Sequence, residues 1–280
     1  MREPTTILIP SEDGVEVAVH DYGGSGQPTL FLHGTGLCSR MWEPVMEQLP
    51  EAVFRPVGVD LRGHAATKTP ADVTFFDHRM VTDLSAVVDA LELDEAWAVG
   101  HSMGAGTTIL TSLARPGRIG RIWAYEPIVM ERGDNHEPLE LMVEVTRKRR
   151  AVFANRAEAG NRWASRPPLD ELSSSSMEVF LRHALVDRPD GQVELACPPE
   201  LEARAFDQFL QQGWDQLPQV RVPVLVAWGE ASDDGAGTTA PAIADRLPRG
   251  TGEVFPGARH FGPFGAGQHT ARSIVSWFGP

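Results

Sequence analysis

The sequence alternates short apolar runs with segments of helical periodicity, and this alternation constrains the fold more than any other feature. Segments such as 76–93 and 104–114 carry apolar residues at helical spacing between the apolar runs. This order is typical of a mostly parallel sheet flanked by helices. The first two runs are separated by the turn-forming sequence SEDG, which predicts an antiparallel hairpin at a sheet edge. The candidate strands are residues 5–9, 15–22, 29–33, 55–60, 96–100, 121–125, 222–228 and 252–256.

The rhythm changes between about Pro127 and Leu217, where strand-like runs stop and helix-like segments are separated by Pro- and Ser-rich loops. We interpret residues 128–217 as a helical cap inserted between two core strands. Residues 1–127 and 218–280 then form the core. Within the insertion, Ser176 is a candidate N-cap. The aromatic residues of the insertion either line an apolar pocket or pack within the cap: Phe153, Trp163, Phe180, Phe206, Phe209 and Trp214.

Composition excludes several classes of partner. A formal net charge of −13 over 280 residues disfavours binding to nucleic acid or to an anionic membrane surface. The basic run at residues 147–150 lies in a helix-like stretch and is interpreted as a solvated face. Two cysteines, Cys38 and Cys197, indicate no disulfide framework, and the N-terminal residues lack an apolar signal core. We therefore expect a cytoplasmic protein without membrane attachment; a homo-oligomeric state is left open.

The stretch AWAVGHSMGAG ends an apolar run at Ser102, with Gly100 and Gly104 two residues away on either side. Glycine is used where the backbone adopts a positive φ or approaches another backbone closely. A serine flanked in this way can be held on a tight strand-to-helix turn with its hydroxyl directed out of the core, as a nucleophile requires. The pattern occurs often by chance, so its meaning depends on the rest of the sequence.

Three further motifs follow other candidate strands. HGTG occupies residues 33–36, GVDLRGHAATKT occupies 58–69, and FPGARHFGPF places His260 after the last strand. Ligands of open α/β sheets bind beyond the carboxyl ends of the strands, where all these motifs are expected. Together with the serine turn, they resemble the α/β-hydrolase family. The resemblance covers roughly residues 1–130 and 215–280 and implies the α/β-hydrolase fold, a mostly parallel sheet flanked by helices.

The resemblance also implies a role for individual residues. Ser102 would be the nucleophile and His260 the base that takes its proton. The backbone N–H groups of Thr35 and Met103 would form the oxyanion hole. No metal or cofactor is implied. The other histidines in these motifs are expected to hold loops or to pack beside the site: His33, His64 and His101.

The acid of the expected triad is ambiguous. The family usually carries it after the strand at 222–228, at the position that Ser232 occupies here, so the sequence departs from the pattern. Asp233 is one residue further along, and Asp234 is a third candidate. Glu126 directly follows the preceding strand, at the distance from Ser102 that some family branches use. Its alternative role is to cap the first turn of the insertion. We favour Glu126 over Asp233.

The resemblance predicts a cofactor-free serine hydrolase that cleaves a carboxylic ester or lactone of a small molecule through an acyl-enzyme on Ser102. The same triad would also serve a carbon–carbon bond hydrolase or a perhydrolase. A rival from another class is a non-catalytic ligand-binding receptor on a hydrolase scaffold. A serine nucleophile disfavours dehalogenase and epoxide-hydrolase chemistry, because both proceed through an alkyl-enzyme ester on aspartate.

Overall fold

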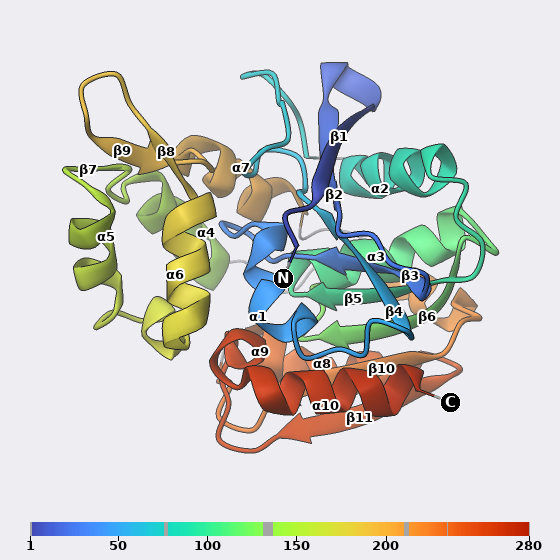
Figure 1. Cartoon of the computed structure of the whole chain (residues 1–280). Helices are drawn as coiled ribbons and strands as arrows, with labels where there is room; N and C mark the ends of the chain where they lie inside the picture. Colours follow the sequence, from blue (N-terminus) through green and yellow to red (C-terminus); the bar gives the residue numbers. More distant parts are fainter. Residues whose placement is uncertain (1, 76–77, 131–136, 210–212, 234, 280) are drawn as a thin grey trace.

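The fold is built on an eight-stranded sheet (Figure 1). The computed structural model describes residues 2–75, 78–130, 137–209, 213–233 and 235–279. The order of the sheet is β1-β2-β4-β3-β5-β6-β10-β11. β1 pairs antiparallel with β2 and β2 with β4, while the other neighbours are parallel. The predicted strands and the edge hairpin are confirmed. The strands are β1 (Thr5–Pro10), β2 (Glu16–Asp21), β3 (Gln27–Leu32), β4 (Phe54–Val59), β5 (Ala96–His101), β6 (Ile119–Tyr125), β10 (Val224–Gly229) and β11 (Gly250–Phe255).

Helices cover both faces of this sheet, because its central strands are apolar on both sides. Leu30 and Leu32 of β3 pack in one core cluster with α2, α3 and α8, while Phe31 between them packs in a second cluster with α1 and α10. Successive side chains of a strand point to opposite faces, which explains this split. The helices are α1 (Glu43–Met46), α2 (Arg79–Ala90), α3 (Met103–Ala114), α8 (Gly235–Arg246), α9 (Gly262–Gly265) and α10 (Gly267–Phe278), with short 3₁₀ turns η1 (Glu12–Gly14), η2 (Ser39–Trp42) and η4 (Trp214–Gln219).

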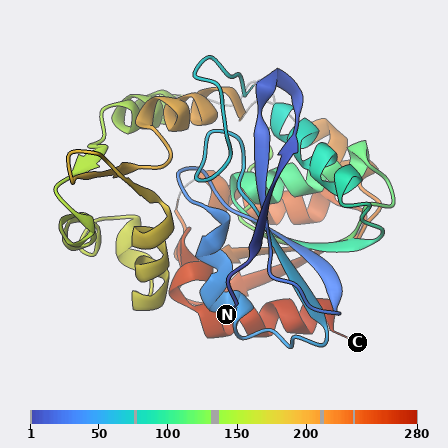
Figure 2. The same ribbon diagram turned by 45° about the horizontal axis from the view of Figure 1, so that its top comes forward.

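The segment between β6 and β10 forms a separate group of elements beside the main sheet (Figures 1 and 2). It is mainly helical, but the expectation that it contains no strands is wrong: three short strands form an antiparallel sheet in the order β7-β9-β8. Strands of two or three residues are too short for a two-residue periodicity to show. The elements are α4 (Glu137–Arg147), β7 (Val152–Phe153), α5 (Arg156–Trp163), η3 (Leu169–Glu171), α6 (Ser174–His183), β8 (Leu185–Asp187), β9 (Val193–Leu195) and α7 (Pro199–Phe209).

The N-cap of α6 is Ser173 and not Ser176. The Ser173 hydroxyl accepts a hydrogen bond from the backbone N–H of Ser176 at 3.2 Å. The Ser176 hydroxyl donates instead to the backbone carbonyl of Phe264, at 2.8 Å. In a run of four serines the residue type alone does not choose the cap, and this tertiary contact decides it.

Trp163 belongs to the core of the segment between β6 and β10. Its ring lies 5.1 Å from that of Phe153 and 5.2 Å from that of Phe180, between centroids. Only 9% of the residue is exposed. The sequence left open whether the aromatic residues of this segment line a pocket or pack within the segment. Trp163 packs within it.

Among the described helices of the chain, none combines the length and the hydropathy needed to cross a bilayer.

Replacing Trp163 by alanine should therefore lower stability. We expect Trp163→Ala to reduce the free energy of unfolding by about 3–5 kcal/mol, as removal of a buried aromatic ring does. Urea denaturation followed by circular dichroism measures the change. Phe206→Ala, at a half-buried position of α7, is the matched control and should cost less. A loss below about 1 kcal/mol in Trp163→Ala would contradict the packing role.

Candidate active site

Ser102 lies on a tight turn between the end of β5 and the start of α3. Its backbone angles are φ 54° and ψ −119°, a conformation that side-chain-bearing residues rarely adopt. Gly100 allows β5 and α3 to meet closely there, and Gly104 allows α3 to approach the end of β3 and His33. A Cβ on Gly100 would lie 2.5 Å from the Cα of Ala105, and one on Gly104 would lie 2.5 Å from the carbonyl oxygen of His33. The local fold thus holds Ser102 at the carboxyl end of the central strands.

The two residues predicted to form the oxyanion hole lie next to each other at this turn. The hydroxyl of Thr35 donates to the sulfur of Met103 at 3.3 Å, so the structure brings the two predicted oxyanion-hole residues together. Within the described part of the chain, neither backbone N–H has a hydrogen-bond acceptor. Met103 opens α3, where such N–H groups carry partial positive charge. A Cβ on Gly34 would lie 3.1 Å from that of Ser102, so the HGTG loop packs directly against the serine.

Two buried histidines hold the HGTG loop. His33 donates from Nδ1 to the carbonyl of Gly34 at 2.8 Å and accepts at Nε2 from the N–H of Leu61 at 3.0 Å. His64 accepts at Nε2 from the N–H of Gly36, at 2.9 Å, and its Nδ1 contacts a loop carbonyl at 2.8 Å. Because carbonyls only accept and amides only donate, both rings are neutral with a fixed tautomer. Burial lowers the pKa of His64 to about 3, consistent with this state.

His260 is hydrogen-bonded to a buried carboxylate. Its Nδ1 lies 2.5 Å from Oε2 of Glu126, which follows β6 directly and is fully buried. The other carboxylate oxygen, Oε1, accepts from the backbone N–H of Gly229 at 2.9 Å and from the hydroxyl of Ser232 at 2.5 Å. The side chain of His260 is 20% exposed. The carboxylate is thus fixed by two donors on one oxygen and holds the imidazole with the other.

The alternative acids are placed differently. Asp233 is exposed to solvent, and Asp234 lies outside the described residues. Ser232, at the position where the family usually carries its acid, donates to Glu126 instead. Sequence reasoning noted Ser232 only as a departure from the pattern and missed this contact. A hydroxyl at that position, together with a glutamate after the neighbouring strand, is the signal that could have revealed the pair.

His101 packs against the loop that carries His260 and forms a hydrogen bond with it. Its Nε2 donates to the backbone carbonyl of His260 at 2.9 Å, and the two rings lie 4.7 Å apart between centroids. Nδ1 is buried without a hydrogen-bond partner among the described residues and packs against Gly34. Burial lowers the pKa of His101 well below its usual value, so the ring is neutral. The sequence predicted a packing role for His101, but not this hydrogen bond.

The segment between β6 and β10 contacts the same loop. The carboxylate of Glu171 accepts from the backbone N–H of Phe261 at 3.2 Å and lies 3.3 Å from the guanidinium of Arg259. The hydroxyl of Ser176 binds the carbonyl of Phe264. The position of the His260 loop therefore depends on side chains from both parts of the molecule.

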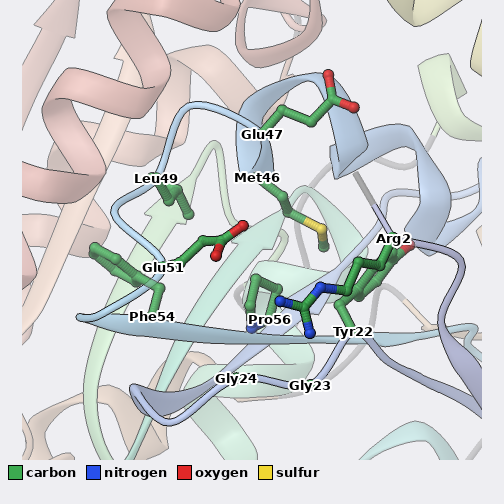
Figure 3. Close-up of a pocket in the computed structure, with 10 residues that line it drawn as sticks. All are labelled: Arg2, Tyr22, Gly23, Gly24, Met46, Glu47, Leu49, Glu51, Phe54 and Pro56. Atoms are coloured by element: carbon green, nitrogen blue, oxygen red, sulfur yellow. The ribbon is translucent and has the colours of Figure 1, made fainter.

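A separate hollow of about 350 Å³ lies at the other end of the sheet. Gly23 and Gly24 precede β3, and Phe54 begins β4, so the hollow adjoins the amino ends of these strands. Figure 3 shows the side chains of Met46 and Glu51 directed toward it. It is thus distinct from the Ser102 turn, which follows a carboxyl end. Within the described residues, no group of three or more His, Cys, Asp or Glu side chains is arranged to hold a metal ion.

Comparison with known proteins agrees with this fold. Residues 27–266 match a family model described as alpha/beta hydrolase fold. The chain belongs to the alpha/beta hydrolase fold family. It is 31% identical over 264 residues to the non-heme chloroperoxidase of Burkholderia pyrrocinia, covering 90% of this chain and 92% of that protein. Membership of this superfamily supports an enzyme and is consistent with a small-molecule substrate.

Two further proteins resemble this alpha/beta hydrolase, one in part of its sequence and one in its fold. The AB hydrolase superfamily protein YisY of Bacillus subtilis (strain 168) is 40% identical over 101 residues, which cover 36% of this chain and only 37% of that relative. The crystal structure of E-2-(acetamidomethylene)succinate hydrolase superposes with a TM-score of 0.82 at 21% identity, covering 99% of this chain and 100% of that one. At that identity, the likeness shows the shared fold.

Proposed function

We propose that this alpha/beta hydrolase is a cofactor-free serine hydrolase that cleaves a carboxylic ester or lactone through an acyl-enzyme on Ser102. The observation that carries the proposal is the 2.5 Å hydrogen bond between Glu126 and Nδ1 of His260. It fixes the tautomer in which Nδ1 carries the proton and Nε2, which is unprotonated, acts as the base. The unpaired N–H groups of Thr35 and Met103 support the same assignment.

The proposed mechanism has two halves. In the first, His260 takes the hydroxyl proton of Ser102 at Nε2 while Oγ attacks the carbonyl carbon of the substrate. The developing oxyanion accepts hydrogen bonds from Thr35 and Met103, and Glu126 stabilises the imidazolium. The imidazolium then protonates the leaving alkoxide, which gives the alcohol and the acyl-enzyme. In the second half, His260 deprotonates a water molecule that attacks the carbonyl carbon of the acyl-enzyme. The bond between that carbon and Oγ of Ser102 then breaks, Oγ takes the proton back from His260, and the carboxylic acid leaves.

We also propose that residues 128–217 act as a cap on a core formed by residues 1–127 and 218–280. The contacts of Glu171 and Ser176 with the His260 loop support this assignment, because they place the segment beside the proposed base. A cap in this position would exclude water and select the substrate.

Perhydrolysis is a second candidate, favoured by the likeness to a non-heme chloroperoxidase over 90% of the chain. In that reaction hydrogen peroxide replaces water as the acceptor of the acyl group from Ser102, and the product is a peracid. The first half of the mechanism is unchanged. The two activities therefore differ only in the nucleophile that the site admits to the acyl-enzyme.

Rapid mixing with 4-nitrophenyl butyrate tests the proposed function. We expect release of 4-nitrophenol to exceed the enzyme-free rate, with an initial burst of about one equivalent per protein wherever hydrolysis of the acyl-enzyme is the slow step. Adding hydrogen peroxide and detecting peracid distinguishes the second candidate. Absence of turnover and of acylation across an ester and lactone series would contradict the proposal and favour a ligand-binding receptor.

A further inference from the structure

One residue of the basic run at 147–150 differs from its neighbours. Arg147, Lys148 and Arg150 form ion pairs with exposed glutamates, which agrees with the predicted solvated face. Arg149 instead pairs with a buried partner, Glu202 of α7, with 2.7 Å between Nη1 and Oε1. The side chain of Glu202 is 5% exposed and that of Arg149 is 31% exposed. Arg149 therefore points toward the interior but remains accessible.

The Arg149–Glu202 pair lies against the HGTG loop. A Cβ on Gly36 would lie 2.3 Å from Oε1 of Glu202 and 3.6 Å from Nη1 of Arg149. Gly36 directly follows Thr35, a proposed oxyanion donor, and is two residues from Gly34, which packs against the serine turn. Two residues span at most about 7 Å. Together with the contacts at its two ends, this span places the guanidinium of Arg149 within about 14 Å of the Cβ of Ser102. An acyl chain that ends in a carboxylate can extend from the serine toward the guanidinium.

Near neutral pH, the negative charge of Glu202 does not fully balance the positive charge of Arg149. Burial raises the pKa of Glu202 to about 7, against the opposing effect of the Arg149 charge. Oε2 of Glu202 is buried without a hydrogen-bond partner among the described residues. Two further titratable groups near the pair, among the residues that the structure describes, are neutral: burial raises the pKa of the Cys197 thiol, and His64 is an uncharged acceptor. When Glu202 is protonated, the positive charge of Arg149 is uncompensated.

We propose that Arg149 binds a carboxylate of the substrate beside the oxyanion hole, so that the enzyme prefers esters or lactones carrying a carboxylate, and that Glu202 is the counter-ion this carboxylate replaces. The proposal rests on the proposed hydrolase function. A guanidinium suits the role because its planar N–H donors match the two oxygens of a carboxylate. Among the described residues, the guanidinium of Arg149 donates one hydrogen bond, to Glu202, which leaves other donors for a ligand.

Two esters of similar length test the proposal. Mono-4-nitrophenyl glutarate carries a carboxylate on its acyl chain, whereas 4-nitrophenyl butyrate is neutral. We expect Arg149→Gln to lower the ratio of kcat/KM for the glutarate ester to that for butyrate by about 10- to 100-fold, the value of a charge-assisted contact. Arg147→Gln is the matched control from the same basic run, paired with Glu200 of the same helix α7, and should leave the ratio unchanged. An equal ratio in Arg149→Gln and the parent would overturn the proposal.

Calorimetric titration with glutarate separates this proposal from the hydrolase function. Binding does not require turnover, so weaker binding to Arg149→Gln than to the parent and to Arg147→Gln supports the subsite even if neither ester is hydrolysed. Hydrolysis of butyrate combined with equal glutarate binding by all three proteins would overturn the subsite and leave the hydrolase function standing.

The dependence on pH tests the role of Glu202. Below about pH 7 Glu202 is protonated and Arg149 is free to bind an anion; above it, the ionised carboxylate competes. The ratio for the two esters should therefore fall as pH rises from 6 to 8, by about tenfold per pH unit at most. Ionisation of His260 affects both esters alike and cancels. Glu202→Gln should make the ratio independent of pH. A parent ratio that stays flat or rises would overturn the counter-ion role.

Discussion

Ser102→Ala should lower kcat for ester hydrolysis by about a millionfold while the protein remains folded. The substitution removes the Oγ atom that forms the acyl-enzyme, and His260 then has no hydroxyl to activate. Stability should change little, because alanine tolerates the positive φ of this turn no worse than serine does. Steady-state kinetics with 4-nitrophenyl butyrate and thermal unfolding followed by circular dichroism measure both quantities.

Ser112→Ala is the matched control, since Ser112 lies in α3, the helix that follows Ser102, and its hydroxyl donates to the backbone carbonyl of Ile109. Its kcat should stay close to that of the parent. Residual activity of Ser102→Ala within tenfold of the parent would remove Ser102 from the mechanism. A fluorophosphonate should label the folded parent at Ser102 but not the heat-unfolded chain, because only the assembled site activates the hydroxyl.

The core of the fold could be predicted from the sequence because its signals are local. The candidate strands at 96–100 and 222–228 are apolar over their whole length, as expected where helices cover both faces of a parallel sheet. Gly100 and Gly104 mark the serine turn because no other residue fits beside Ala105 and His33. The position of Glu126 could be predicted for a similar reason. Ser102 and Glu126 each follow one of two neighbouring strands, β5 and β6.

The features that the sequence did not reveal depend on contacts between distant segments. Ser232 acquires a role only where the loop after β10 meets the end of β6, at Glu126. The hydrogen bond of His101 goes to a backbone carbonyl, which has no signature in the sequence. Arg149 looks like its basic neighbours until α7 places Glu202 opposite it. In each case the sequence gives the residue type but does not indicate which distant residue it contacts.

Glu126→Gln should lower kcat by about three to four orders of magnitude, as the loss of a triad acid does. The structure gives the reason. Oε1 of Glu126 accepts from two donors, the N–H of Gly229 and the hydroxyl of Ser232. In the variant these donors would keep the amide oxygen at that position and direct the NH₂ group toward Nδ1 of His260. Nδ1 would then have to accept, the ring proton would move to Nε2, and the base for Ser102 would be lost.

Asp233→Asn is the matched control for this prediction. It makes the same change of acid to amide at the rival position, where the side chain is exposed, and kcat should stay within about twofold of the parent. Ser232→Ala should have an intermediate effect, because it removes one of the two donors that orient Glu126 but leaves the carboxylate and its bond to His260. If Asp233→Asn lost more activity than Glu126→Gln, with both variants folded by circular dichroism, the role of the acid would pass to Asp233. The hydrogen bond from His260 to Glu126 would then describe a resting arrangement that rearranges before Ser102 attacks.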